Sequence, residues 1–166
     1  MRKVIKKISI VIVATAMTVA MCATCFAGTT FEGYFGQREN WYEGADGSLS
    51  GATASSFSAD MDAIGWGGVW GAQAHRDITV KKGQKYTLSF KATSTTVEKW
   101  VFFKVTDSQD TVVYADWLHL QPGVTENYKA TFKASANATF IYYGMGGEFG
   151  DRQGVDTDKD LSLIHI

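Results

Sequence analysis

Cysteine, proline and an excess of charge of either sign are scarce in this sequence, and each scarcity excludes a class of protein. Both cysteines of the 166 residues, Cys22 and Cys25, lie within the first 27. The rest of the chain therefore has no disulfide framework, zinc–thiolate site or catalytic thiol. Lysine plus arginine number 16 against 17 for aspartate plus glutamate, a formal net charge of −1. This balance gives no electrostatic basis for binding nucleic acid or an anionic membrane surface.

Sustained helical periodicity is also missing beyond residue 27, and Pro122 is the only proline. The chain instead has 13% aromatic residues, 17 glycines, and short stretches in which apolar and polar residues alternate. Such stretches recur at intervals of about ten residues with turn signals between them, which predicts an all-β sandwich. Expected strands, besides the pair described below, cover residues 31–35, 55–61, 100–106, 111–114, 117–120, 128–133 and 140–145, and residues 44–56 are expected mainly as loop.

The N-terminal segment, residues 1–27, reads as a secretory signal. Four basic side chains within residues 2–7 precede an apolar run over residues 8–21, which is too short to be a convincing membrane span. Small residues at signal-peptidase positions place the predicted cut after Ala27. A retained anchor is the alternative. We therefore expect a domain over residues 28–160 that is secreted or associated with the cell wall, and that does not stay in the membrane after signal cleavage.

The C-terminal residues, 161–166, read as one frame of a common sequencing adapter, and the stretch before them is polar and loop-like. We therefore expect these six residues to be non-native. The native chain would then continue beyond Asp160, and the domain would be truncated at its C-terminus.

The stretch from Trp66 to Ala92 carries the clearest strand signals. Two segments with period-two alternation flank a polar, glycine-containing turn at residues 81–84, and this pattern predicts a β-hairpin. One face of the second segment is wholly apolar, with Tyr86, Leu88, Phe90 and Ala92 in alternate positions. The aromatic residues expected in the core are Trp70, Tyr86, Phe90, Phe103, Tyr128, Phe132 and Tyr143.

A second alternating pattern predicts a binding surface. If Val101, Phe103 and Val105 face the core, then Trp100, Phe102 and Lys104 face the other way, although a one-residue bulge would reverse this assignment. Gln73 and His75 are expected on the polar side of the preceding strand, with a plain solvent-exposed sheet face as the alternative. Flat aromatic rings stack on the C–H faces of sugars, and planar polar groups reach sugar hydroxyls, so this combination suits a neutral glycan.

One motif in the middle of the chain is more specific than alternation alone. It reads Trp70-x-x-Gln73 and then Ile78-x-Val80-x-x-Gly83-x-x-Tyr86-Thr87-Leu88-Ser89-Phe90-x-Ala92. Phe31-Glu32-Gly33 precedes it, and Leu118-x-Leu120, Tyr128-x-Ala130-x-Phe132 and Ile141-x-Tyr143-x-Met145-Gly146 follow it. Across residues 30–147 these motifs resemble the carbohydrate-binding modules of families 4, 9 and 22, the CenC-like modules.

The resemblance implies a jelly-roll β-sandwich of two antiparallel sheets with a glycan cleft on one of them. It adds Tyr114, Trp117, Tyr142 and Trp41 to the candidate binding residues Trp100, Phe102, Lys104, Gln73 and His75. Glu32 matches the calcium-binding glutamate of the family, so a structural Ca²⁺ is implied, whereas no cofactor is expected for catalysis. The last strand of the family has no counterpart after Gly147, and we expect it to be absent through truncation.

These observations predict a binding module, with no enzyme among the residues present. No nucleophile elbow, phosphate loop or same-strand carboxylate pair in an aromatic setting occurs in the sequence. We expect a monomer that binds a β-linked polysaccharide of the β-glucan or xylan class and targets an attached secreted glycoside hydrolase to it. Two alternatives stay open, namely a small secreted jelly-roll glycanase and a wall-associated adhesion module that binds protein.

Overall fold

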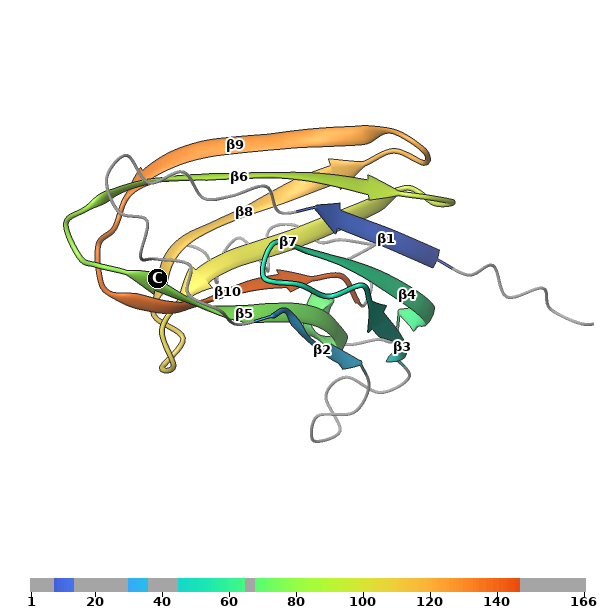
Figure 1. Cartoon of the computed structure of the whole chain (residues 1–166), viewed down its shortest axis with the longest axis horizontal. Helices are drawn as coiled ribbons and strands as arrows, with labels where there is room; N and C mark the ends of the chain where they lie inside the picture. Colours follow the sequence, from blue (N-terminus) through green and yellow to red (C-terminus); the bar gives the residue numbers. More distant parts are fainter. Residues whose placement is uncertain (1–7, 14–29, 36–44, 65–67, 147–166) are drawn as a thin grey trace, which may run out of the picture.

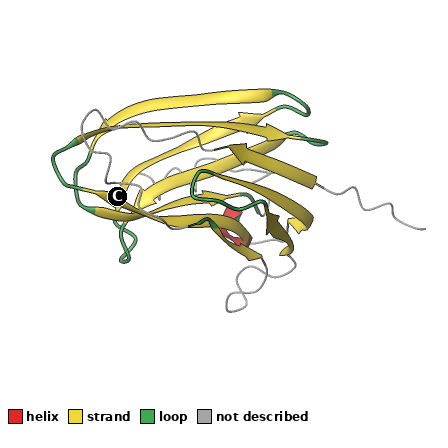
Figure 2. Ribbon diagram, viewed as in Figure 1, coloured by secondary structure: helices red, strands yellow, loops and turns green. Residues whose placement is uncertain are grey.

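The computed structural model describes residues 8–13, 30–35, 45–64 and 68–146. Within these ranges the chain forms two five-stranded sheets, and each pairing between their strands is antiparallel. The two sheets lie face to face (Figures 1 and 2). The β-sandwich of two antiparallel sheets that the sequence predicts is therefore confirmed.

The two sheets are called sheet A and sheet B below. Sheet A has the order β3-β4-β1-β6-β9, formed by β3 (Ala45–Ser50), β4 (Ser56–Ile64), β1 (Ile8–Val13), β6 (Lys85–Ser94) and β9 (Thr125–Lys133). Sheet B has the order β2-β5-β10-β7-β8, formed by β2 (Glu32–Phe35), β5 (Ala72–Val80), β10 (Ala138–Gly144), β7 (Lys99–Thr106) and β8 (Val112–Leu120). One 3₁₀ turn, η1 (Val69–Gly71), leads into β5.

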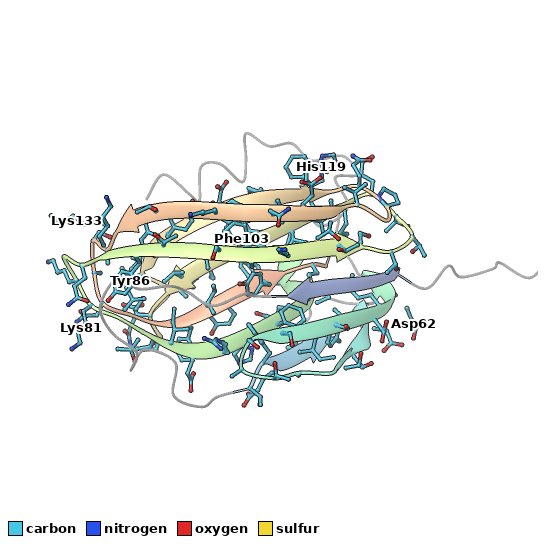
Figure 3. The ribbon with its side chains drawn as sticks, turned by 45° about the horizontal axis from the view of Figure 1, so that its top comes forward. Asp62, Lys81, Tyr86, Phe103, His119 and Lys133 are labelled. Atoms are coloured by element: carbon cyan, nitrogen blue, oxygen red, sulfur yellow. The ribbon has the colours of Figure 1, made fainter. Side chains whose placement is uncertain are left out.

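The core lies between the sheets and follows the alternation of the sequence. On β7, Val101, Phe103 and Val105 are each 0% exposed, and Figure 3 labels Phe103 near the middle of the sandwich. Its ring meets that of Phe90, from the opposite sheet, edge to face with centroids 5.0 Å apart. Burying one such ring contributes about 1.5–3 kcal/mol. The predicted core aromatics Tyr86, Phe90, Phe103, Phe132 and Tyr143 are all buried.

The predicted hairpin between β5 and β6 is wrong. β5 pairs with β2 and β10 in sheet B, whereas β6 pairs with β1 and β9 in sheet A, so residues 81–84 carry the chain from one sheet to the other. Figure 3 shows Lys81 at the same end of the sandwich as Lys133. The backbone N–H of Lys81 donates to Tyr86 Oη at 2.9 Å, and that of Gly83 donates to Ala134 at 2.8 Å. A polar turn with a positive-φ glycine serves a sheet crossing as well as a hairpin.

Two further strands differ from the sequence prediction. β3 forms within a stretch expected as loop, because it pairs with β4 at the edge of sheet A although Leu49 is the only large apolar residue in it. Gly47 allows this pairing, since a Cβ there would meet the Asp60 carbonyl oxygen at 2.4 Å. β8 is one continuous strand from Val112 to Leu120, where two short strands were expected.

The apolar run of the predicted signal contributes β1, which pairs with β4 on one side and β6 on the other. Cleavage after Ala27 stays a prediction. The domain boundaries at residues 27 and 160, both cysteines, the adapter-like residues 161–166 and Trp41 all lie outside the described residues. Among the residues that are described, there is no helix of the length and apolar character needed to cross a membrane.

Candidate functional site

The face of sheet B that is turned away from the core carries most of the candidate residues, and we call it the outer face. On β7, Trp100, Phe102 and Lys104 alternate with the fully buried Val101, Phe103 and Val105. The irregularity in the pairing of β7 with β8 falls between Val105 and Thr106. It lies beyond all three candidates, so no bulge reverses their direction.

Cross-strand pairing extends this face over the whole sheet, because residues opposite each other in an antiparallel pair share a face. Tyr142 on β10 pairs with His75 on one side and with Lys104 on the other, and His75 pairs in turn with Glu32. A second row joins Tyr34, Gln73, Gly144, Phe102 and Trp117, and a third joins Trp100 and His119. Seven of the predicted binding residues thus lie on one face: Gln73, His75, Trp100, Phe102, Lys104, Trp117 and Tyr142.

Trp70 also lies on the outer face, which corrects its prediction as a core residue. Its half-buried ring meets Phe102 edge to face at 5.3 Å and Tyr142 at 6.4 Å between centroids. Lys104 Nζ lies 4.4 Å from the centroid of the same ring, a cation–π contact. Gly144 provides the space for this arrangement, because a Cβ there would meet Val69 Cγ2 at 2.8 Å and Trp70 Cε3 at 3.2 Å.

One end of the outer face is an aromatic shelf of Trp100, Phe102, Trp117 and His119. The His119 ring stacks on Trp100 with centroids 4.5 Å apart and an angle of 13°, and Trp117 lies 4.9 Å from Phe102. His119 Nε2 is 2.6 Å from Glu98 Oε1, a contact that fixes the orientation of the imidazole. Trp100 and Trp117 are half-buried, so each ring retains surface that an incoming molecule can cover.

Polar groups gather beside the aromatic rings toward β2. His75 stacks on Tyr142 at 5.2 Å, and its Nε2 lies 3.8 Å from Glu32 Oε2. His75 Nδ1 and Tyr34 Oη are buried and have no hydrogen-bond partner among the described residues. A buried polar atom without a partner costs free energy, so this part of the outer face holds two unsatisfied polar groups.

Two further polar side chains are held in place by their neighbours. Gln73 is 9% exposed, and its Nε2 donates to the Trp70 carbonyl oxygen at 3.1 Å. Lys104 Nζ donates to Asp110 Oδ1 at 2.5 Å, from the turn between β7 and β8. The cation over Trp70 is therefore neutralised by an adjacent carboxylate, and the outer face carries balanced charge at this point.

Comparison with solved structures identifies similar folds. A structure described as "CBM4 structure and function" superposes with a TM-score of 0.51 at 17% sequence identity, covering 69% of this chain and 82% of that one. The chain has a CBM4-like fold. No family model matches the sequence, and no curated protein matches it.

Tyr114 is the predicted binding residue that the CBM4-like sandwich places elsewhere. It pairs with Val105, a core residue, and its ring stacks on Phe132 of sheet A at 4.7 Å. Tyr114 Oη contacts Tyr128 Oη, and Tyr128 Oη donates to Asp116 Oδ2 at 2.6 Å. Tyr114 thus joins the sheets at one edge instead of lining the outer face. Burial raises the pKa of Tyr114 and, together with the Asp116 hydrogen bond, that of Tyr128.

The metal prediction rests on Glu32, whose side chain is 77% exposed beside His75. Within the described residues, no group of three or more His, Cys, Asp or Glu side chains has the arrangement of a metal site. A structural Ca²⁺ at Glu32 stays a prediction. Trp41, the remaining binding candidate, lies outside the described residues.

Sequence alternation missed Trp70 because this residue lies within η1 and not in β5. Parity counted along a strand does not extend through a 3₁₀ turn, so the position of Trp70 relative to Ala72 says nothing about its face. A usable signal was the Gly67-Gly68 pair, since Gly68 has a φ of 111° and marks a change of chain direction just before Trp70.

Proposed function

We propose that the outer face of sheet B binds a polysaccharide without cleaving it. The observation that carries the proposal is the band of half-buried rings, Trp70, Tyr142, Trp117 and Trp100, which surrounds Phe102 on an open sheet surface. Aromatic faces pack against the C–H faces of sugar rings, and a monomeric domain rarely leaves so many aromatic rings on one face without a binding role. The CBM4-like fold agrees with such a role.

Charge pairing on this face favours a neutral glycan. Each of three basic side chains on this face has an acidic neighbour: Lys104 forms an ion pair with Asp110, and His119 and His75 lie beside Glu98 and Glu32. A charged sugar would have to compete with these partners and would leave one of them without its counterpart. Together with the resemblance of the sequence to the CenC-like modules, this makes a β-linked glucan or xylan the proposed ligand class.

In the proposed role, the domain holds an attached secreted glycoside hydrolase close to its substrate. The gain would come from effective concentration and needs no bond chemistry in this domain. The predicted signal segment, the calcium at Glu32 and the linked catalytic domain all belong to this proposal and are each open to a direct test.

Affinity electrophoresis of the full chain tests the proposal. The gels would contain β-1,3-, β-1,4- or mixed-linkage glucan, xylan or mannan. Trp100→Ala and Trp117→Ala are expected to abolish the retardation that the unmodified chain shows in at least one gel. Thr131→Ala is the matched control, because its side chain bonds Thr87 Oγ1 on the exposed surface of sheet A, far from the aromatic band. Retardation that survives both tryptophan substitutions would rule out this face.

Two other outcomes would replace the proposal. Release of reducing sugar by the purified chain, lost on substitution of a carboxylate, would identify a glycanase. Absence of retardation in every gel, together with specific capture of a wall protein, would identify an adhesion module.

A further inference from the structure

The central strand of sheet A lies in a segment that the sequence predicts to be cleaved from the rest of the chain. β1 is the third of the five strands, and no direct pairing joins β4 to β6 in the described residues. Yet β1 belongs to the segment that the sequence predicts to be removed by signal peptidase. Removal would leave the facing edges of β4 and β6 open inside a sheet.

Those two edges are specific for one kind of partner. β1 pairs along its full length with β4, from Ile8↔Met61 to Val13↔Ser56, and over four positions with β6, from Ile10↔Ser94 to Val13↔Lys91. Both pairings are antiparallel. An occupant must therefore be extended, and it must offer backbone donors and acceptors on both of its sides.

The residues opposite β1 show which side chains the position tolerates. Alternate partners are core residues: Met61 is 1% exposed, Ala59 0%, Phe57 1% and Ala92 1%. The segment between them, Ile-Ser-Ile-Val-Ile-Val, has no charge, and four of its six residues pair on both flanks. A charged residue at an alternate position would have to lose its hydration against these neighbours, which is unfavourable.

We propose that the space between β4 and β6 is a strand-acceptor site, which binds the N-terminal apolar segment of this chain even when the covalent connection to β2 has been cut. The binding is β-strand addition on two edges at once, with main-chain hydrogen bonds providing affinity and alternate apolar residues providing specificity. The site lies in sheet A and is independent of the glycan-binding role proposed for sheet B.

The first experiment uses the full chain, produced in the cytosol, with a specific protease site placed between β1 and β2. After cleavage, the N-terminal fragment is expected to co-elute with the domain. A fluorescent peptide with the sequence of residues 7–14 should then replace it. The same peptide carrying Ile10→Asp should bind at least about 100-fold more weakly, because residue 10 lies opposite Ala59 and Ser94, both 0% exposed.

A second measurement does not depend on cleavage. With both native cysteines changed to serine, Val11→Cys and Ser58→Cys lie at paired positions, where Cα atoms of an antiparallel pair are about 4.5–5.5 Å apart and a disulfide can form. Val11→Cys with Ser56→Cys is the matched control, because Ser56 pairs with Val13. The first pair is expected to cross-link and the control pair is not.

Three results would overturn the proposal. The first is loss of the fragment from the cut protein with no change in the midpoint of its thermal unfolding. The second is a peptide carrying Ile10→Asp that binds as tightly as the unmodified peptide. The third is equal cross-linking by the two cysteine pairs. A cut protein that releases the fragment without added peptide and forms a dimer would assign the site to a second copy of the chain and would likewise refute this segment as the occupant.

Discussion

Replacing Trp70 with alanine distinguishes the outer-face position of this ring from a core position. The structure gives the ring two edge-to-face contacts, with Phe102 and Tyr142, and one cation–π contact, with Lys104. Aromatic pairs contribute about 0.5–1.5 kcal/mol each and an exposed cation–π contact about 0.5–1 kcal/mol. The expected loss in free energy of unfolding is therefore about 1.5–4 kcal/mol.

The matched variant is Phe90→Ala, in the centre of the core. Phe90 is 1% exposed and contacts Phe103, Tyr128 and Tyr143, so its truncation should cost about 3–5 kcal/mol. At about 2–4 °C per kcal/mol for a chain of this size, Phe90→Ala is expected to have the lower melting temperature of the two. Urea unfolding followed by tryptophan fluorescence and far-ultraviolet circular dichroism gives both free energies.

Glycan affinity provides the second half of this test. Under conditions where both variants are folded, Phe90→Ala should bind the best ligand of the electrophoresis panel as the unmodified chain does. Trp70→Ala should bind it at least about tenfold more weakly, equivalent to about 1.4 kcal/mol. A Trp70→Ala protein that keeps full affinity and loses at least as much stability as Phe90→Ala would refute the outer-face assignment.

Three other predictions concern parts of the structure that the Trp70 test does not reach. Gly144→Ala should lower the free energy of unfolding by about 1–3 kcal/mol and weaken glycan binding in the same gels. The reason is that the new Cβ would displace Val69 and with it Trp70. Unchanged melting and binding would contradict this reasoning. Burial raises the pKa of Tyr114, Tyr128 and Tyr143. Their contribution to the free energy of unfolding is therefore fully present below about pH 10, where all three are neutral, and is lost as the pH rises further. The urea midpoint should fall above that pH, and Tyr128→Phe should make the fall less steep; an equal fall in both proteins would argue against a role for this hydroxyl. Finally, Thr131→Val should change stability by less than about 0.5 kcal/mol and leave retardation in glycan gels unchanged, and a loss of retardation would place a ligand contact on sheet A.

Strand alternation predicted the part of the site that lies within regular strands. Val101, Phe103 and Val105 determine the direction of Trp100, Phe102 and Lys104, because the period of a strand is two and no bulge intervenes. The same rule would have corrected Tyr114. Tyr114 and Trp117 are three residues apart on the continuous strand β8, so they face opposite sides, and an interpretation as two separate short strands concealed this.

Sequence could not predict which strands pair. The turn at residues 81–84 has the composition of a hairpin turn, and the crossing is apparent only from the pairing of β5 with β2 and β10 and of β6 with β1 and β9. This pairing is a property of the whole sandwich and leaves no local signal. The same holds for β3, whose edge position depends on pairing with β4 and is not apparent from its own weak β propensity.

The place of β10 in sheet B has a consequence for how the chain folds during synthesis. β10 is the last described strand in the sequence and yet the central strand of its sheet, between β5 and β7. A ribosome that has released residues up to β8 has made four strands of sheet B that still lack their middle member. Pairings over such long sequence separations form slowly. The nascent chain should therefore remain open until residues 138–144 emerge, although most of sheet B has by then been synthesised.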